Sequence, residues 1–408
     1  MPNTLCVPRV AGTFLLASSL VSSTVWAGED EPIELVQART EIPEAELLDV
    51  GIQVFDPGLP AEESALYELE QKGTFADIRK SEARYIPFRL MQTLQSTGYW
   101  GAVRLVPAAN RVDLMITGTI LSSNGKELEL EIQAVDAAGT RWLRERYKRE
   151  ANPIAYHQKR DSVEQPDAYQ DLYHQIANDL LERRTKIDAE DIERVRRVSQ
   201  LTFAVDLAPT PFGEYLAVDG KGRYSVHKLP AVDDPMMRRV AHIRERDYMF
   251  IDTLNEFYAG FCSRMEEPYD SWRAFSYEEQ MALDQLRRAA MWEKILGAAA
   301  IFGGVMARDR AGSGAVIVGT AVLMDGMQKS EEAKMHVESL RELAASLDAD
   351  VAPLLIDVEG EVTRLSGSVE TQYETWRSLL RRIFASETGL PLDPNTEKPL
   401  VGTGPAHH

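Results

Sequence analysis

A ladder of small residues spaced four apart runs through an apolar stretch, residues 295–327, and constrains the fold more than any other feature of this chain. Small side chains at this spacing lie on one helix face and let a second backbone approach closely, which is how helices associate in lipid. We therefore expect this face to be an association surface. Its members are Ala299, Gly303, Ala307, Ala311, Ala315 and Gly319.

The stretch divides into two apolar arms, residues 295–307 and 315–324, separated by a charged and glycine-rich interruption, residues 308–314. Neither arm reaches the ~20 residues that cross a bilayer core. Three arrangements fit this pattern: a helical hairpin dipping into a membrane from one side, a long helix that oligomerises through the ladder, and two arms paired within a soluble helical core. We interpret the stretch as a helical hairpin that looks like a glycine zipper, in lipid or in protein.

The N-terminal residues predict export. Arg9 is the only charge before Glu29, and it precedes an apolar run, residues 10–21, that is too short for a membrane span but suits a signal-peptide core. Val25 and Ala27 supply small residues at the spacing expected for cleavage. Residues 1–27 are therefore predicted to be a cleaved signal peptide, and the protein to be periplasmic, peripheral to the outer or inner membrane. An uncleaved N-terminal anchor is the alternative.

Charge and cysteine content limit the partners and the sources of stability. The formal net charge is −19, and such a surface repels phosphate backbones, so we expect no nucleic-acid partner. Cys262 is the only cysteine after the signal peptide, so no internal disulfide can form and packed cores must stabilise the fold. Residues 28–47 are acidic and poor in large apolar side chains, which predicts a solvated acidic leader.

Residues 48–185 show the pattern of a small α+β domain. A short strand from Val50 to Phe55 precedes a helix in which Pro87 is expected in the first turn. Strands are then predicted at residues 102–106, 114–121 and 128–134, with Asn124-Gly125 as the turn of a hairpin. In the returning strand apolar and polar residues alternate, so one sheet face is expected to be buried and the other wet. A strand at residues 140–147 and a helix with a stripe from Tyr169 to Leu180 complete the domain.

This order of elements resembles the small α+β domain of the TolB N-terminal region, the curli secretion channel and the penicillin-binding-protein activators. The resemblance covers residues 48–184 and rests on Gly51 to Gly58 (GIQVFDPG) and Asp113 to Asn124 (DLMITGTILSSN). It implies a protein-binding module of the bacterial envelope that has no catalytic activity.

Residues 186–294 predict a helical region with a β-hairpin near residues 215–226. One helix is expected to begin at Asp188 and a long-helical segment at Pro235. Glu267-Pro268 predicts a break in this segment, and Ser276 with Glu279 forms a capping box that predicts the start of a second helix. Apolar residues at spacings of three, four and seven form the expected packing seam: Val240, Ile243, Phe250, Leu254, Phe257 and Phe261.

Residues 328–389 predict a small C-terminal α+β module of helix, two strands and helix, followed by a flexible tail, residues 390–408. Residues 338–389, and in particular Val358 to Val369, resemble the BON domain of periplasmic and outer-membrane proteins. A Pro-rich and Gly-rich tail stands here in place of that family's final strand. The resemblance implies envelope attachment and contact with phospholipid. The basic residues that could face lipid headgroups are Arg364, Arg377, Arg381 and Arg382.

No motif predicts a catalytic residue, a cofactor or a metal site. The seven histidines are scattered and none is followed by Glu, as a zinc-protease helix requires. The chain has neither a G-x-S-x-G elbow nor a C-x-x-C pair. Asp171, His174 and Asn178 share a helix face, which we interpret as solvated, and Cys262 is expected to be a small core residue.

The sequence as a whole predicts an α+β protein with a mixed α/β N-terminal domain, a long-helical middle that includes the Ala/Gly hairpin, and the C-terminal module. The function expected from it is that of a non-catalytic envelope protein, an accessory or assembly factor that binds envelope proteins and associates with membrane lipid or with itself. Two alternatives stay open: a soluble periplasmic hydrolase with an unrecognised site, and a structural homo-oligomer with the ladder as its interface.

Overall fold

The structure is a computed structural model that describes residues 32–70, 74–157, 166–302, 338, 342, 354–358, 361–365 and 368–392. For residues 286–302, 354–358 and 361–364 it describes the backbone alone. The chain divides into two compact units, Met1–Pro32 and Ile33–His408, and the elements below belong to the second.

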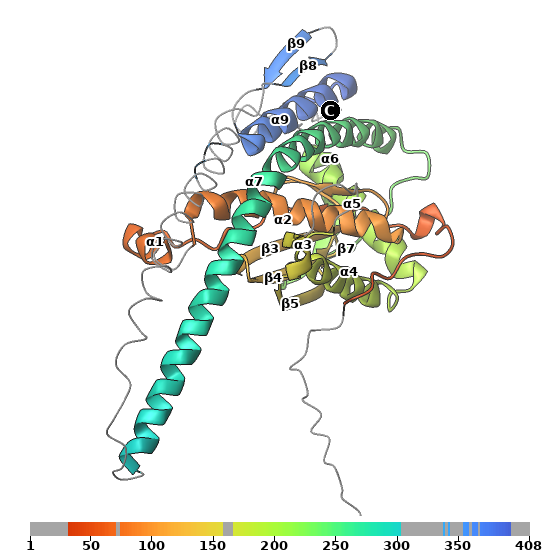
Figure 1. The fold of residues 1–408 in the computed structure, drawn as a ribbon. Coiled ribbons are helices and arrows are strands. Elements are labelled where there is room, and N and C mark those ends of the chain that lie inside the picture. Colours follow the sequence, from red (N-terminus) through yellow and green to blue (C-terminus); the bar gives the residue numbers. More distant parts are fainter. Residues whose placement is uncertain are drawn as a thin grey trace, which may run out of the picture. The chain divides into compact units, whose positions relative to one another are not determined.

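The described residues confirm the predicted α+β class, with a mixed five-stranded sheet, two-stranded hairpins and long helices (Figure 1). The elements in chain order are η1 (Glu44–Glu46), β1 (Val50–Ile52), α1 (Glu63–Glu70), α2 (Ala76–Thr97), β2 (Val103–Leu105), β3 (Leu114–Ser123), β4 (Glu127–Asp136), β5 (Arg141–Glu150), α3 (Pro153–His157), α4 (Gln170–Arg184), α5 (Ala189–Leu207), α6 (Pro209–Phe212), η2 (Gly213–Tyr215), β6 (Leu216–Val218), β7 (Tyr224–Val226), α7 (Pro235–Phe302), β8 (Leu354–Val358), β9 (Glu361–Leu365) and α9 (Val369–Thr388).

The five-stranded sheet has the strand order β2-β1-β3-β4-β5. β1 is parallel to both of its neighbours, so that Val50 lies between Val103 and Leu114, while β3, β4 and β5 form an antiparallel meander. The predicted Asn124-Gly125 turn joins β3 to β4. The Asn124 side-chain oxygen accepts a hydrogen bond from the Glu127 N–H at 2.9 Å, and Gly125 adopts the positive φ that this turn requires.

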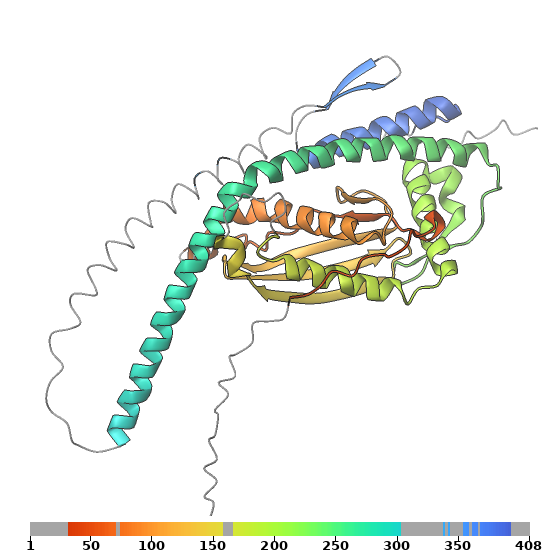
Figure 2. The same ribbon diagram turned by 45° about the vertical axis from the view of Figure 1, so that its right-hand side comes forward.

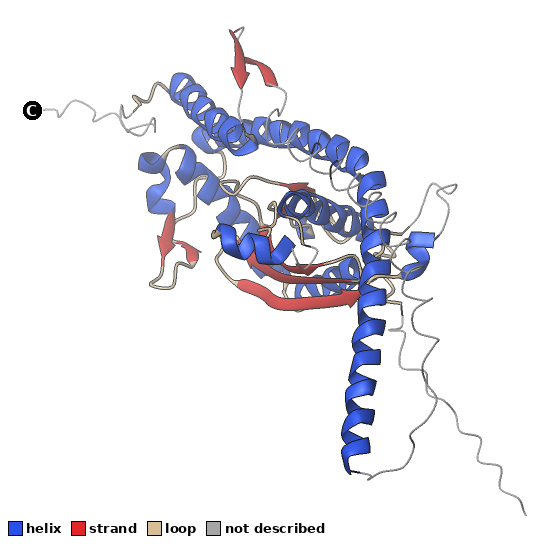
Figure 3. Cartoon of the chain, turned by 60° about the vertical axis from the view of Figure 1, so that its left-hand side comes forward, coloured by secondary structure: helices blue, strands red, loops and turns tan. Residues whose placement is uncertain are grey.

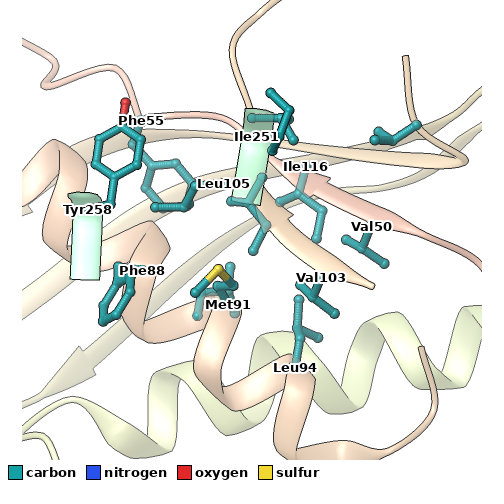
Figure 4. Packing of buried hydrophobic residues seen from close by; sticks show 14 of the residues in the cluster. Val50, Phe55, Phe88, Met91, Leu94, Val103, Leu105, Ile116, Ile251 and Tyr258 are labelled. Atoms are coloured by element: carbon teal, nitrogen blue, oxygen red, sulfur yellow. The ribbon is translucent and has the colours of Figure 1, made fainter. Parts of the chain in front are cut away.

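One face of the sheet is buried, as the alternation in β4 predicted. Buried and half-buried residues alternate along the whole of β4, and α2 and α4 pack together over the buried face. Figure 4 shows the core beneath α2, where the strand residues Val50 and Ile116 meet Met91 and Leu94 of the helix. Ile251 of α7 joins the same cluster, so the long helix packs on this core.

The prediction for Pro87 is wrong, because α2 begins at Ala76 and the proline lies in the helix interior. An interior proline lacks the N–H that would bind the carbonyl four residues earlier, which here belongs to Ala83. The Phe55 N–H donates to this carbonyl at 2.8 Å. The segment after β1 thus supplies the missing donor, and this tertiary hydrogen bond offsets part of the cost of the proline.

The predicted break at Glu267-Pro268 and the predicted helix start at Ser276 are also wrong. α7 continues from Pro235 to Phe302, 68 residues, which corresponds to about 100 Å of helix. Tyr269 and Trp272, directly after the proline, are buried against the rest of the fold, and this packing favours helix on both sides of Pro268. Figure 2 shows α7 as one ribbon with a bend along its length, the usual effect of an interior proline.

Part of the predicted solvated leader is docked on the fold. Residues 33–38, here called the N-terminal strap, lie along α4 and the end of α2. The His174 Nδ1–H donates to the Ile33 carbonyl at 2.6 Å, and the Asn178 amide binds both the Glu34 carbonyl and the Val36 N–H at 2.9 and 3.0 Å. The polar face of α4 that we interpreted as solvated therefore binds backbone, which corrects both predictions.

The remaining predicted elements in the described residues are present. α5 begins after Asp188, whose carboxylate accepts a hydrogen bond from the Asp191 N–H at 2.8 Å, and β6 and β7 form the hairpin expected near residues 215–226. β8 pairs with β9, and α9 follows the N-cap Ser368. Through stacking of Phe250 on Trp376, α7 and α9 pack together, so one hydrophobic core extends from the sheet to the C-terminal helix.

Candidate functional site

The structure describes one position of the predicted association face. Ala299 lies near the end of α7, where the backbone alone is described. Gly303, Ala307, Ala311, Ala315 and Gly319 lie outside the described residues, so the helical hairpin and its partner stay predictions. Among the helices that the structure describes, none is long and apolar enough to cross a membrane.

Arg377 does not lie where a lipid headgroup could reach it. It is 3% exposed, its guanidinium contacts the Asp206 carboxylate, and it stacks over the Phe203 ring with its Cζ 4.9 Å from the ring centroid. The prediction of headgroup contact is therefore wrong for Arg377, because this residue lies on the inner face of α9.

The other three predicted headgroup residues occupy different environments. Arg381, also on α9, lies 3.9 Å from the Asp206 carboxylate and is mostly covered. Arg382 is exposed on the outer face of α9. Arg364 lies on β9, where the backbone alone is described. The structure thus brings Arg377 and Arg381 together around an acid and separates them from the exposed Arg382.

A buried polar cluster beside Arg377 joins α9 to α7. Asp247 of α7 accepts hydrogen bonds from the Tyr373 hydroxyl at 3.2 Å and from the Asn110 side-chain amide at 3.3 Å. Burial raises the pKa of Asp247 to about 7, and burial lowers the pKa of Arg377 to about 9. These groups bind one another and not solvent. Their contacts hold α9 against α7, which is a structural role.

A second buried cluster fixes α7 to the sheet domain. Both terminal nitrogens of Arg273 donate to the Asp167 carboxylate, at 3.1 and 3.0 Å, and the guanidinium lies 4.4 Å from the centroid of the Tyr269 ring. Burial acts to raise the pKa of Asp167, but the adjacent Arg273 outweighs it and holds this pKa below its usual value. Bidentate pairing and aromatic stacking together satisfy a guanidinium that is almost fully buried.

The same region of α7 also binds α2 and β3. The Glu82 carboxylate of α2 accepts hydrogen bonds from the Tyr269 hydroxyl at 2.8 Å and from the Ser123 hydroxyl at 2.6 Å. Arg79 completes the group with an ion pair to Glu82 at 3.1 Å. We call Glu82, Asp167, Tyr269 and Arg273 the α7 anchor. Its members face one another, so they have a structural role.

An open pocket of about 980 Å³ lies beside the amino-terminal ends of the parallel strands. Its walls come from the segment before β1, from α5 and from α7. Acidic side chains outnumber basic ones along it, which makes it a mixed rather than an anion-binding surface. The charged residues that line the pocket are Glu44, Glu46, Asp49, Asp113, Glu193, Arg196, Arg197, Arg244 and Glu245.

The two aspartates in this pocket connect the strand ends to one another. The Asp113 carboxylate accepts a hydrogen bond from the Asp49 N–H at 2.9 Å, and the Asp49 carboxylate accepts one from the Ala102 N–H at 2.9 Å. Burial raises the pKa of Asp113. Open α/β sheets bind ligands outside the carboxyl ends of their parallel strands, whereas this pocket lies at the opposite ends. The aspartates therefore fix the geometry of β1, β2 and β3.

Arg244 and Tyr248 of α7 also line the pocket. The Arg244 guanidinium donates to the Ser199 hydroxyl at 2.7 Å and to the Tyr248 hydroxyl at 2.8 Å, and Arg104 stacks on the Tyr248 ring at 4.7 Å. Burial raises the pKa of Tyr248 to about 12, so the phenol is protonated near neutral pH. These contacts hold the Arg244 and Tyr248 side chains in place along the pocket.

The α7 anchor and the pocket were not predicted from the sequence. Asp167 and Arg273 are 106 positions apart, and neither belongs to a motif or to an apolar stripe. Cys262 was predicted correctly as a core residue, since it is buried and burial raises the pKa of its thiol. In the part of the chain that the structure describes, no three His, Cys, Asp or Glu side chains are placed to bind a metal ion.

Comparison of the chain with family models, with curated proteins and with solved structures gave no match. The resemblances of residues 48–184 and 338–389 to envelope domains therefore stay predictions.

Proposed function

We propose that this protein is a non-catalytic accessory or assembly factor of the bacterial cell envelope. It is exported by a cleaved signal peptide, residues 1–27, and acts in the periplasm. The sheet domain binds envelope proteins, and the ladder associates with membrane lipid or with other copies of the chain.

The continuity of α7 is the observation that carries this proposal. The helix that bears Ala299 is the same helix whose earlier turns hold Phe250 and Arg273 in the core. The contacts described between α7 and the sheet domain extend to Asp284, which binds Lys126 at 2.6 Å. A single helix thus connects a folded sheet domain to the start of the predicted association face, and this connection supports the proposed role.

The pairing of the charged groups supports a binding role over a catalytic one. Asp167 and Asp247 are each buried, and each binds groups of the fold itself. Catalytic acids and bases must instead lie within hydrogen-bond reach of a substrate. The open pocket, with its mixed charge, suits contact with another protein's polar side chains better than it suits chemistry.

Cell fractionation tests the proposal. Export predicts a mature chain that begins at Gly28, which N-terminal sequencing or intact mass would show. We expect the protein in the membrane pellet after a high-salt wash, or in a defined oligomer after extraction. Release of a folded monomer in plain buffer would contradict the proposal.

A substitution in the ladder identifies the association face. Replacing Gly303 and Gly319 with Leu prevents close helix approach, so the variant should lose membrane association or the oligomer while it keeps the sheet domain folded. Gly220→Leu, on the open β6–β7 turn, is the control because nothing lies within 4 Å of a Cβ added there. An unchanged oligomeric mass and an unchanged pellet in the double variant would exclude the ladder as the association face.

A further inference from the structure

The two edge strands of the five-stranded sheet differ in whether their outer backbone groups have a partner among the described residues. At β2 the Asn255 side chain of α7 mimics a neighbouring strand: its Oδ1 accepts a hydrogen bond from the Leu105 N–H, and its Nδ2 donates to the Leu105 carbonyl, both at 2.8 Å. At the other edge lies β5, ten residues long, and within the described residues β4 is the only strand paired with it. The long outer edge of β5 can therefore accept a further strand (Figures 1 and 3).

The open face of β5 carries a row of cations. Arg144, Arg146 and Lys148 lie at alternating positions, so their side chains point to the same face of the sheet, and they are 56%, 68% and 54% exposed. Their acidic partners lie inward on β4: Glu131 binds both arginines, at 2.9 and 3.3 Å, and holds a lowered pKa through these bonds. The chain as a whole has a net charge of −19, so this row on the edge strand is positive where the protein overall is negative.

This row disfavours pairing with a second copy of the chain. Two β5 strands related by a two-fold axis would run antiparallel, and residues of the same sheet face would lie opposite each other. Arg146 would then face Arg146, or Arg144 would face Arg146, in the registers that pair the row with itself. Like charges directly opposite are destabilising. The charge pattern therefore selects against a copy of this chain and in favour of a strand of opposite charge.

We propose that the outer edge of β5 binds an extended acidic segment of another protein by strand addition, with Asp or Glu at every second position of that segment. Backbone hydrogen bonds to β5 supply affinity, and acids opposite Arg144, Arg146 and Lys148 supply specificity. The sheet would then alternate an acidic row on β4, a basic row on β5 and an acidic row on the partner. This inference deepens the partner-binding role proposed above and rests on it.

Peptide binding to the purified full chain tests the proposal. The probes are a fluorescent (Thr-Glu)₅ peptide, a (Thr-Lys)₅ peptide, and a (Thr-Glu)₅ peptide N-methylated at every second residue, all measured by fluorescence anisotropy. We expect binding of the first peptide alone. The Arg144→Glu/Arg146→Glu variant should bind it at least about tenfold more weakly, because two attractive cross-strand pairs with the peptide become repulsive.

Arg238→Glu/Arg239→Glu, an equal charge change at two exposed positions of α7, is the matched control and should bind (Thr-Glu)₅ like the parent chain. Circular dichroism and a thermal melt establish that each variant is folded. If the N-methylated peptide binds as tightly as (Thr-Glu)₅, strand addition is excluded. If the Arg144→Glu/Arg146→Glu variant binds (Thr-Glu)₅ as tightly as the parent chain, β5 is not the binding site. If no peptide binds, the proposal is wrong and the cations only protect the edge of β5 from pairing. The assay does not involve the ladder, so loss of membrane association in fractionation and loss of peptide binding are separate results.

Discussion

At the scale of single residues, the fold depends on charges that are fully covered. Arg273 and Asp167 have side chains that are 3% and 1% exposed, and their bidentate contact lies among aromatic rings. Transfer of either charge alone to such a site is very unfavourable, so the two must be buried together. α7 can therefore pack against the sheet domain only when both members of the pair are present, whatever the net contribution of the pair to stability.

Replacing Arg273 with Met should lower the free energy of unfolding by about 3–5 kcal/mol, because Asp167 then remains buried without its cation. Urea denaturation at neutral pH measures the change. Arg194→Met is the control: Arg194 pairs with Asp191 at the exposed surface of α5, and such pairs contribute at most about 1 kcal/mol. A loss below 1 kcal/mol for the Arg273 variant would contradict the role assigned to the anchor.

Asp247 should make stability depend on pH. Its pKa is about 7 in the fold and about 3.9 in an unfolded chain, so the folded protein holds the proton more tightly. The contribution of Asp247 to the free energy of unfolding is therefore largest below about pH 4, and it is lost as the pH rises toward 7. Compared with Asp247→Asn, the parent chain should lose up to about 1.4 kcal/mol of unfolding free energy per pH unit in that window. Unfolding free energies at several pH values measure the difference.

The variant Asp233→Asn, at an exposed position, is the control for this pH series and should follow the parent chain throughout. A constant difference between the parent and Asp247→Asn from pH 4 to 7 would mean that Asp247 keeps an ordinary pKa in the fold.

At the scale of elements, side-chain amides complete backbone pairing where secondary structure ends. Asn255 binds the edge of β2, and Asn178 binds the N-terminal strap, each through its oxygen and its NH₂ group. An Asn amide has the same donor and acceptor as a peptide group, so it can replace one residue of a neighbouring strand. Two helices, α4 and α7, thus hold extended segments without any added strand.

Asn255→Ala should expose the Leu105 amide to hydrogen exchange. The variant removes both partners of the Leu105 backbone groups, which we expect to cost about 1–3 kcal/mol of stability. Exchange measured by NMR or mass spectrometry should show faster labelling of the peptide that contains β2. Thr253→Ala, whose hydroxyl bonds only within α7, should leave that peptide unchanged. Protection of β2 that is equal in both variants would exclude the proposed closure of this edge.

At the scale of the whole molecule, the β3–β4 turn is a point of contact between the sheet and α7. Gly125 has a φ of +77°, and a Cβ added there would lie 2.6 Å from the Arg273 carbonyl oxygen. The turn that links two strands therefore also touches the α7 anchor. Because the sheet, α7 and α9 share one hydrophobic core, we expect them to unfold together.

The pair Gly125→Ala and Gly222→Ala separates backbone strain from this contact. Both glycines have a φ of +77°, but nothing lies within 4 Å of a Cβ at Gly222. Each variant should lose about 1 kcal/mol through strain, and Gly125→Ala should lose at least about 1 kcal/mol more because α7 must shift. Thermal unfolding measures both. Equal losses would mean that the turn does not constrain α7.

The features that could be predicted from the sequence are those that depend on interactions between residues close together in the chain. The alternation in β4 and the turn at Asn124 depend on neighbouring residues, and both were predicted correctly. The helices through Pro87 and Pro268 were not, because distant partners stabilise them: the Phe55 N–H in one case and the buried surface of α7 in the other. The same holds for the candidate site. The positive charge of Arg377 suggested contact with lipid headgroups, but the sequence did not show that α9 covers this residue against Asp206 and Phe203.

The length of α7 has a mechanical consequence. From Asp284, which binds Lys126, to Phe302 the helix continues for about 27 Å at its usual rise, so a force applied across the Phe302 end acts with leverage on the contacts that attach α7 to the sheet domain. A sideways pull at that end would load the Lys126–Asp284 ion pair first and the buried Arg273–Asp167 pair next. A tether joined to Phe302 in a single-molecule stretching experiment should therefore detach α7 at a lower force in the Arg273→Met chain.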